Sequence, residues 1–162
     1  MITDLYEKFK SATGVTTDTR AIEKDNIFFA LKGENFNGNL FAEQALNNGA
    51  KYAVIDEEVF KKDERYILVE DVLTALQNLA SHHRDQFKIA VIGITGSNGK
   101  TTTKELINAV LSTSFKTFAT VGNFNNHIGV PLSLLSITEE TKIAIIEMGA
   151  NHMGEIANYC KW

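Results

Sequence analysis

Apolar and polar positions along the chain follow two periods, one typical of strands and one typical of helices. Continuous apolar runs, and segments rich in β-branched and aromatic residues, predict strands. These segments are 27–31, 52–55, 66–69, 89–92, 117–121 and 143–148. Helical spacing, capping residues and the only proline predict helices between them. The helical segments are 5–9, 41–48, 71–84, 100–112 and 131–135. Strands that alternate with helices imply parallel sheets with right-handed crossovers, and therefore an α/β fold.

The pattern also predicts which faces of two helices are buried. The helix over 71–84 has Asp71 as a candidate N-cap and should pack through one face. That face carries Val72, Leu76, Leu79 and His83. In the helix over 100–112, the residues expected to face inward are Leu106, Ile107, Val110 and Leu111. His82 and His83 have no Cys or His at metal-ligand spacing, so we interpret them as helix-surface residues rather than ligands.

The predicted elements fall into two candidate domains. Residues 1–86 form a small α/β domain, and residues 87–162 form a second domain that opens with the strand at 89–92. Within the first domain, residues 15–22 are polar and turn-rich, and residues 32–39 are rich in Gly and Asn, which predicts a loop. The last residues, GEIANYCKW, follow a helical pattern without a cap, so we expect the sequence to be a fragment.

Composition and charge narrow the classes of function. Apolar residues make up 44% of the 162 residues and charged residues 22%, as in a soluble globular protein. The formal net charge of −4 argues against a nucleic-acid partner, since such proteins usually present a basic face. No apolar run is long enough for membrane insertion, and the N-terminus lacks the apolar core of a signal peptide. The only cysteine is Cys160, which excludes an internal disulfide. We therefore expect a cytoplasmic protein, and a monomer.

The stretch 91–104, VIGITGSNGKTTTK, carries the clearest chemistry. A buried strand leads into a glycine-rich turn, and Lys100 and Thr101 then open a helical pattern, which is the layout of a phosphate-binding loop. Lys100 would contact the β- and γ-phosphates, and the Thr101 hydroxyl would complete a Mg²⁺ shell. The candidate phosphate-loop residues are Thr95, Gly96, Ser97, Asn98, Gly99, Lys100, Thr101 and Thr102. The alternative is an ordinary strand-to-helix turn with a surface lysine.

Polar residues that follow two predicted strands are further candidates. In an open α/β sheet the C-terminal strand ends face the ligand crevice, so Glu147 is expected beside the glycine loop, where a carboxylate can bind Mg²⁺. The alternative is a strand-end acid in solvent. The nearby His152 is either a packed or surface histidine or a group beside the metal and the transferred phosphoryl group. The loop after 117–121 holds asparagines that either shape the turn or contact the substrate and the nucleotide. They are Asn123, Asn125 and Asn126.

Three stretches together resemble the Mur ligases, the ATP-dependent amino-acid ligases of peptidoglycan synthesis. They are TGSNGKTTTK at 95–104, GNFNNHIGVP at 122–131 and EMGANHMGEI at 147–156. The first departs from the common GxxxxGK[ST] spacing, because Ile94 stands in place of its first glycine. The other two are most similar to the branch of the family that adds D-Ala-D-Ala. The resemblance covers nearly the whole chain. It implies a UDP-substrate domain at 1–86, followed at 87–162 by the first part of a parallel-sheet ATPase domain with the phosphate loop.

The resemblance also implies a reaction, its cofactors and its partners. The carboxylate of UDP-MurNAc-tripeptide would attack the γ-phosphate of ATP, with Mg²⁺, and D-Ala-D-Ala would then displace phosphate from the acyl phosphate. Lys100, Glu147 and His152 are the implied catalytic residues, and the implied metal ligands are Thr101, Glu147 and His152. The implied substrate contacts are Asp18, Thr19, Arg20, Lys32, Gly33, Asn37, Asn123, Asn125 and Asn126. For Asp18 and Arg20 the alternative is a helix cap and a surface salt bridge. Without the dipeptide-binding domain of the family, the chain alone is expected to ligate nothing.

Two other functions fit part of the pattern. A sister Mur enzyme or folylpolyglutamate synthetase would share the loop, although the folate enzyme resembles GKGS rather than the GKTT at 99–102. A nucleotide-switched binding module would use ATP or GTP only to change shape, but the NKxD pattern that reads a guanine base is not in this sequence. Phosphate release separates the two classes, because a ligase needs its acceptor and a switch does not.

Overall fold

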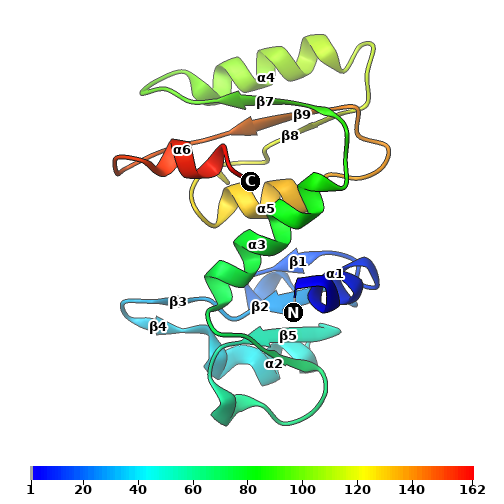
Figure 1. Cartoon of the computed structure of the whole chain (residues 1–162), viewed down its shortest axis with the longest axis vertical. Helices are drawn as coiled ribbons and strands as arrows, with labels where there is room; N and C mark the ends of the chain where they lie inside the picture. Colours follow the sequence, from blue (N-terminus) through cyan, green and yellow to red (C-terminus); the bar gives the residue numbers. More distant parts are fainter. Residues whose placement is uncertain (1) are drawn as a thin grey trace. The chain divides into compact units, whose positions relative to one another are not determined.

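A computed structural model describes residues 2–162, and its contacts divide the chain into two compact units, Met1–Leu79 and Ala80–Trp162. The division falls inside the long helix α3 (Val72–Asp85). Each unit contains its own parallel sheet (Figure 1). The α/β fold class expected from the sequence is therefore confirmed. Within residues 2–162, no helix has both the length and the apolar character needed to cross a bilayer.

The first unit is built on a four-stranded parallel sheet in the order β1-β2-β5-β6. Its strands are β1 (Val15–Thr16), β2 (Ile27–Phe29), β5 (Tyr52–Ile55) and β6 (Tyr66–Leu68). Its helices are α1 (Ile2–Lys10), α2 (Ala42–Asn47) and the first turns of α3. Single 3₁₀ turns are η1 (Thr19–Ala21), η2 (Gly38–Phe41) and η3 (Glu58–Phe60). The small side chains of Ala42 and Ala45 let α2 pack closely on Phe28 and Ile55 of the sheet.

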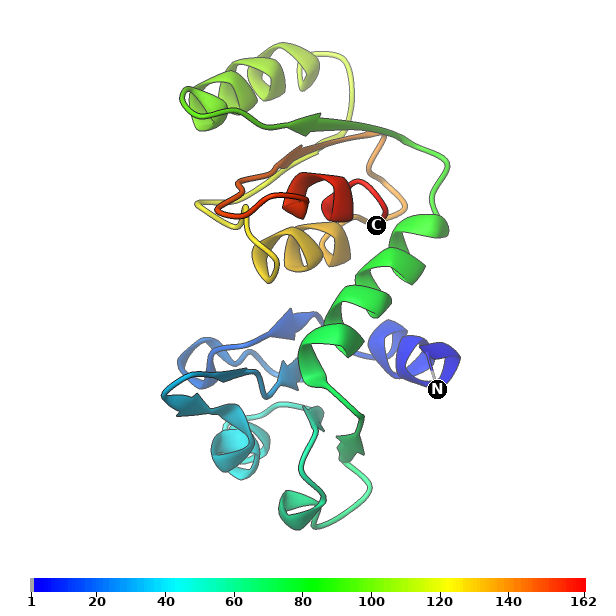
Figure 2. The same cartoon turned by 60° about the vertical axis from the view of Figure 1, so that its left-hand side comes forward.

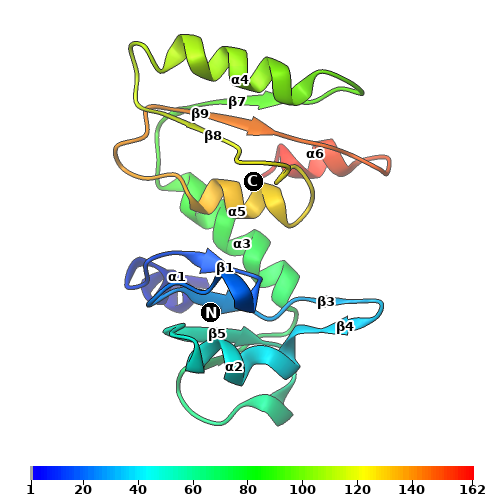
Figure 3. The same cartoon turned by 180° about the vertical axis from the view of Figure 1, so that it is seen from behind.

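Residues 32–39, expected as a loop, form a short antiparallel hairpin that projects beyond the sheet (Figure 3). Its strands are β3 (Lys32–Gly33) and β4 (Phe36–Asn37), and η2 follows directly. The chain returns so closely that a Cβ atom on Gly38 would lie 2.5 Å from the carbonyl oxygen of Leu31. Only glycine fits there, and the hairpin is thereby fixed next to the C-terminal end of β2.

The second unit has a three-stranded parallel sheet in the order β7-β9-β8. The strands are β7 (Ala90–Ile94), β8 (Thr117–Ala119) and β9 (Ile143–Glu147). Helix α4 (Lys100–Leu111) covers one face, and α5 (Gly129–Leu135) and α6 (Glu155–Tyr159) cover the other (Figures 1 and 2). Strand β9 has a neighbour on each side, so Glu147 at its end is held by the centre of the sheet.

The predicted inward face of α4 is wrong for two of its four residues. Leu106 and Val110 are 64% and 69% exposed, whereas Ile107 and Leu111 are half-buried. Leu106 and Val110 line an apolar hollow with Ile92 of β7, which pairs with β9 alone among the described strands. The position of α4 that is fully buried is a charged one, Lys104. The apolar pattern mispredicted this face because it cannot tell which side of the helix the sheet covers.

Helix α3 confirms one prediction and corrects another. Asp71 caps the helix, since its Oδ1 atom accepts a hydrogen bond from the Thr74 N–H at 2.7 Å. Val72, Leu76 and Leu79 are buried as expected. His83 is also buried, and its Nε2 atom lies 2.8 Å from the carbonyl oxygen of Ile137, so its interpretation as a helix-surface residue is wrong. The carbonyl of Ile137 and the ring of Phe87, whose centroid lies 4.9 Å from that of the imidazole, allow His83 to be buried without a metal.

Candidate functional site

The glycines of the loop between β7 and α4 give its backbone an unusual shape. Gly96 has a φ of 145° and Gly99, the N-cap of α4, has a φ of 76°, conformations that residues with a side chain rarely adopt. The helical ladder begins with the hydrogen bond from Thr103 N to Gly99 O, so the preceding N–H groups have no acceptor within the helix. The Lys100 ammonium donates to the Gly96 carbonyl oxygen at 2.8 Å. An anion held here meets free N–H groups, a lysine and the positive end of the helix.

A cavity of about 360 Å³ opens beside this loop, lined by three separate segments of the second unit. Its lining residues are Ser97, Asn98, Gly99, Lys100, Thr101, Thr102, Asn125 and Glu147. Glu147 lies opposite Ile94, the last residue of β7, in the register of the sheet. The fold thus gathers the loop, one asparagine of the loop after β8 and the carboxylate that ends β9 at one edge of a parallel sheet, where ligands of α/β folds bind.

The carboxylate of Glu147 is buried and only partly hydrogen-bonded. Its Oε1 atom accepts from Asn125 Nδ2 at 2.9 Å, and its backbone N–H donates to Thr120 Oγ1 at 3.0 Å. The N–H of Gly149 donates to the carbonyl oxygen of Asn125 at 2.6 Å, which ties that loop to the end of β9. The Oε2 atom of Glu147 has no hydrogen-bond partner. The interpretation of Glu147 as a solvent-exposed strand-end acid therefore does not describe its environment.

A divalent cation fits this set of donors. A buried carboxylate oxygen without a donor is satisfied by a cation, and the hydroxyl-bearing Thr101 lines the same cavity. Carboxylate and hydroxyl oxygens are ligands that Mg²⁺ accepts. Within residues 2–162 no three His, Cys, Asp or Glu side chains gather into a metal cluster. A Mg²⁺ ion would therefore complete its shell with phosphate oxygens and water, as it does at many nucleotide sites.

Other candidates in this unit lie outside the lining of the cavity. Asn126 caps the start of α5, because its Oδ1 atom accepts from the N–H groups of Ile128 and Gly129 at 3.0 and 2.8 Å. Asn123 is exposed, and its carbonyl accepts from the Asn125 N–H at 2.7 Å. His152 is exposed, and its N–H donates to Glu155 Oε2 at 3.1 Å. Contacts of Asn123, Asn126 and His152 with ligands stay predictions.

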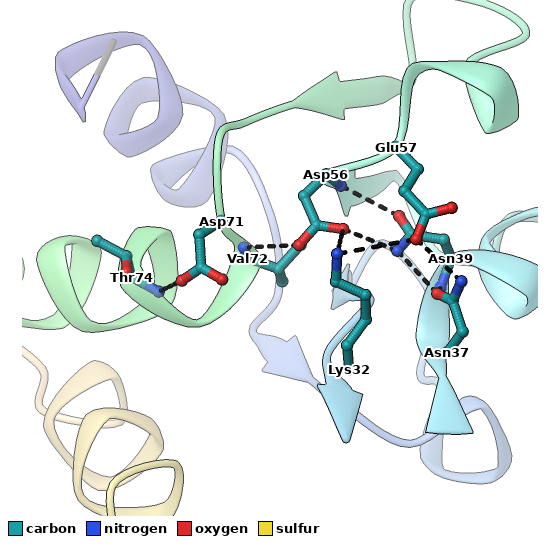
Figure 4. Close-up of polar contacts among 8 residues, drawn as sticks. All are labelled: Lys32, Asn37, Asn39, Asp56, Glu57, Asp71, Val72 and Thr74. Carbon is teal, nitrogen blue, oxygen red and sulfur yellow. Dashed lines mark hydrogen bonds and ion pairs between the residues drawn. The ribbon is translucent and has the colours of Figure 1, made fainter. Parts of the chain in front are cut away.

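A second polar cluster lies in the first unit, at the C-terminal ends of β2 and β5 (Figure 4). The ammonium of Lys32 lies 3.1 Å from Asp56 Oδ1 and 3.7 Å from Glu57 Oε1. The side chain of Asp56 is 2% exposed, and it also accepts from Asn39 Nδ2 at 2.8 Å. Two carboxylates thus share the charge of Lys32, and the cluster as a whole is negative.

The same cluster includes Asn37, another candidate substrate contact. Its Oδ1 atom accepts from the N–H of Asn39 at 3.0 Å and so caps η2, while its Nδ2 atom donates to Glu57 Oε1 at 3.0 Å. Gly33 is exposed in β3, with open space around the position of a Cβ atom. Lys32, Gly33 and Asn37 therefore lie on one hairpin, and Asn39 and Asp56 hold that hairpin against the end of β5.

Asp18 and Arg20 form a local pair at η1. The Asp18 carboxylate accepts from the Arg20 N–H at 2.9 Å and from the guanidinium atoms Nε and Nη2 at 2.9 and 2.7 Å. Hydrogen bonds from the Arg20 side chain and backbone lower the pKa of Asp18 from 3.8 to about 2. Thr19 contributes its carbonyl oxygen to Asn48 Nδ2 at 3.1 Å. The cap and the surface salt bridge are both present, and a substrate role for these three residues stays a prediction.

The Asp56 cluster predicts a stability that depends on pH. Burial alone raises the pKa of Asp56, but hydrogen bonds from Asn39, Lys32 and the Val72 N–H outweigh it and hold the pKa below 3.8. The stabilisation is therefore complete above the unfolded-state pKa and is lost as the pH falls through the lower folded-state value. We expect Asp56→Asn to lower the free energy of unfolding by about 1–3 kcal/mol at neutral pH. The difference should shrink below a pH of about 4.

Urea unfolding across that pH range measures this dependence. Asp63→Asn is the matched control, since Asp63 belongs to an exposed pair with Arg65 and should change the free energy of unfolding by less than about 1 kcal/mol. A difference between Asp56→Asn and the unmodified protein that stays constant from neutral to acid pH would rule out ionic stabilisation by this carboxylate.

Sequence reasoning missed two of the best-placed polar groups. Asp56 directly follows β5, and the strand-end argument applied to Glu147 would also have found it. The sequence did not indicate that Lys104 is buried, because a lysine in a polar stretch of helix predicts a solvated side chain. Its burial becomes visible only when α4 is packed on the sheet.

Family models match both halves of the chain. The model described as "Mur ligase family, catalytic domain" matches residues 11–84, and the model described as "Mur ligase middle domain" matches residues 94–161. Two similar relatives are UDP-N-acetylmuramoyl-tripeptide–D-alanyl-D-alanine ligases. The Bacillus subtilis enzyme is 50% identical over 145 residues, covering 88% of this chain and 32% of the relative. The Escherichia coli enzyme is 46% identical over 143 residues, covering 88% and 31%.

Solved structures give the same picture. MurF from Acinetobacter baumannii matches with a TM-score of 0.83 and 39% identity, over 91% of this chain and 32% of that one. MurF ligase from Thermotoga maritima in complex with ADP matches with a TM-score of 0.81 and 35% identity, over 91% and 34%. A UDP-N-acetylmuramoyl-L-alanyl-D-glutamate–2,6-diaminopimelate ligase matches at 0.53 and 21% identity, which indicates a shared fold. The chain spans about a third of the length of the relatives that it matches.

Proposed function

Since the chain belongs to the Mur ligase family, we propose that it forms the UDP-substrate domain and the first part of the ATP-binding domain of a UDP-N-acetylmuramoyl-tripeptide–D-alanyl-D-alanine ligase. The family resemblance in the sequence anticipated this function. The domains proposed are residues 1–86 for the UDP-linked substrate and residues 87–162 for ATP. The ligation reaction would also require the part of the relatives' length that this chain does not cover.

The observation that best supports the proposal is the pairing of the phosphate loop with a buried acid. Glu147 carries an oxygen without a hydrogen-bond partner, and it lines the same cavity as Lys100 and Thr101. A nucleotide polyphosphate with Mg²⁺ supplies both the anion that the loop attracts and a ligand for the carboxylate oxygen that has no hydrogen-bond partner. The similar Thermotoga maritima structure is a complex with ADP, which supports nucleotide binding by a protein of this fold.

Each residue of the cavity has a proposed part in phosphoryl transfer. The backbone N–H groups from Gly96 to Thr101 hold the phosphate oxygens, and the Lys100 ammonium leaves Gly96 to bind the β- and γ-phosphates. The Thr101 hydroxyl and the Glu147 carboxylate would hold Mg²⁺, which neutralises phosphate charge when bound. Asn125 orients Glu147 through the 2.9 Å hydrogen bond to Oε1, so that Oε2 is left for the ion. His152 is proposed to join this site when the substrates are bound.

The proposed reaction has two steps. A carboxylate oxygen of UDP-MurNAc-tripeptide attacks the γ-phosphorus of ATP, the bond to the β–γ bridging oxygen breaks, and ADP leaves. The amine of D-Ala-D-Ala then attacks the carbonyl carbon of the acyl phosphate, loses a proton, and expels inorganic phosphate as the amide forms. The loop accelerates the first step by stabilising charge on the transferred group.

The first unit is proposed to bind the UDP-linked substrate. Lys32, Gly33 and Asn37 lie on the hairpin at the C-terminal edge of the sheet, where ligands of parallel sheets bind. Lys32 shares its charge with two carboxylates, so the exposed Arg20 is the better placed of the two cations to pair with a diphosphate. Asp18 holds Arg20 in its turn, and Thr19 precedes Arg20 in η1. From the second unit, Asn123, Asn125 and Asn126 are proposed to contact the peptide end of the substrate.

Phosphate release by the full-length protein tests the function. The proposal predicts release that requires both UDP-MurNAc-tripeptide and D-Ala-D-Ala together with Mg-ATP. A sister enzyme of the family would instead require a different UDP-linked acceptor and a different amino acid. Release that is independent of any acceptor would identify a nucleotide switch and refute the ligase.

A further inference from the structure

Lys104 is a buried charged residue to which the proposed mechanism gives no part. Its side chain is 1% exposed, although it lies on α4 only one turn beyond Lys100. The ammonium donates to the carbonyl oxygen of Thr120 at 2.6 Å and lies 3.0 Å from Glu105 Oε1. Burying a charged lysine is unfavourable unless its charge and its donors are matched, so a specific partner must compensate for it.

The remaining neighbour of this ammonium is the candidate metal ligand. Lys104 Nζ lies 4.0 Å from Glu147 Oε2, close enough for a strong charge interaction but too far for a hydrogen bond. The same Oε2 atom has no hydrogen-bond partner. Both side chains are 1% exposed, so water weakens their attraction little.

Thr120 holds the two charged groups in this arrangement. Its carbonyl oxygen accepts from Lys104, and its hydroxyl oxygen accepts from the backbone N–H of Glu147 at 3.0 Å. Thr120 is itself buried at the end of β8. The short hydrogen bond to Thr120 and the contact with Glu105 keep the ammonium from closing the last gap to Oε2.

We propose that Lys104 is a positioning residue, the resident counter-ion of Glu147, which holds the carboxylate toward the phosphate loop and leaves its Oε2 atom open for a divalent cation. Lys104 does not line the cavity, and its ammonium contacts Thr120, Glu105 and Glu147. Its influence on the reaction therefore passes through Glu147. The inference rests on the proposed function in one respect, the assignment of Glu147 as the acid that binds the cation.

Thermal unfolding of four full-length proteins tests the charge pairing: the unmodified protein, Lys104→Met, Glu147→Gln and the double variant. Lys104→Met keeps the length of the side chain and leaves Glu147 without a counter-ion, which should lower the unfolding midpoint by about 5 °C or more. The double variant removes both charges and should regain at least half of that loss. Lys116→Met is the control, because Lys116 is exposed in the same unit, and its midpoint should stay unchanged.

Mg²⁺ with ADP provides the second readout. In Lys104→Met the divalent cation supplies the only compensating charge, so Mg-ADP should raise the midpoint by at least about 3 °C more than it does in the unmodified protein. The Glu147→Gln substitution should abolish that excess. A side chain that merely fills space would produce neither the rescue nor the excess.

The outcomes separate this inference from the proposed function. The proposal is overturned if the double variant is no more stable than Lys104→Met. It is also overturned if Mg-ADP raises the unfolding midpoints of Lys104→Met and of the unmodified protein equally. If Lys104→Met does not fold, the double variant decides, since a folded double variant supports the counter-ion and an unfolded one overturns it. If Mg-ADP does not change the midpoint of the unmodified protein, the proposed nucleotide site is refuted. The stability regained by the double variant then tests the counter-ion role of Lys104 by itself.

Discussion

Replacing Lys100 with Ala in the full-length protein is expected to lower the rate of phosphate release by about 10³-fold or more. In the structure the Lys100 ammonium reaches only the Gly96 carbonyl oxygen, so its removal leaves no buried charge behind and should not disturb the fold. The loss follows because no other cation lines the cavity within the part of the chain that the structure describes. Binding energy used on the transferring phosphoryl group is realised in the transition state and appears in kcat.

Steady-state phosphate release and calorimetric binding of UDP-MurNAc-tripeptide together measure this effect. Binding of the UDP-linked substrate should be retained, because Lys100 is not among the proposed contacts of that substrate. Lys116→Ala is the matched control, as Lys116 is an exposed lysine of the same unit and should keep full activity. Turnover within about tenfold of the unmodified protein would contradict the phosphate-binding role and would favour an ordinary strand-to-helix turn.

Changing Glu147 to Gln is expected to raise the Mg²⁺ concentration needed for half-maximal activity by about tenfold or more. The substitution keeps the shape of the side chain and the hydrogen bond that Oε1 accepts from Asn125. It replaces the unpartnered Oε2 atom by an amide nitrogen, which is a donor and does not bind a hard cation. The Mg²⁺ requirement should therefore change more than the affinity for the UDP-linked substrate.

A Mg²⁺ titration of activity at saturating ATP measures the midpoint. Glu140→Gln is the control, since Glu140 is an exposed acid of the same unit at 3.9 Å from Lys116 and should leave the midpoint unchanged. An identical midpoint in Glu147→Gln and the unmodified protein would remove Glu147 from the metal site. It would also contradict the assumption that Glu147 binds the cation, on which the role proposed for Lys104 rests.

Hydrophobic period and turn chemistry predicted much of the fold. The strand over 52–55 and the cap at Asp71 appear at the predicted residues, and the strand over 143–148 ends one residue earlier, at Glu147. The cap depends on a contact between residues close in sequence, and the strands depend on burial along their whole length. Both therefore leave a pattern that can be seen in the sequence itself. The glycine-rich turn before α4 was predictable for the same reason, because Gly96 and Gly99 act through local backbone geometry.

The tertiary structure alone decided the features that depend on which faces meet. Leu106 is exposed and Lys104 is buried on the same helix, since the side of α4 that the sheet covers is set by residues far away in sequence. The register of β9 with β7 puts Glu147 beside the loop, and the loop after β8 brings Asn125 to its Oε1 atom. The sequence by itself determined the α/β class and the glycine-rich turn before α4, because both depend on local sequence patterns. Only long-range packing determined which oxygen of Glu147 has no hydrogen-bond partner and which lysine lies beside it, because the neighbours of a buried charge come from segments far apart in the sequence.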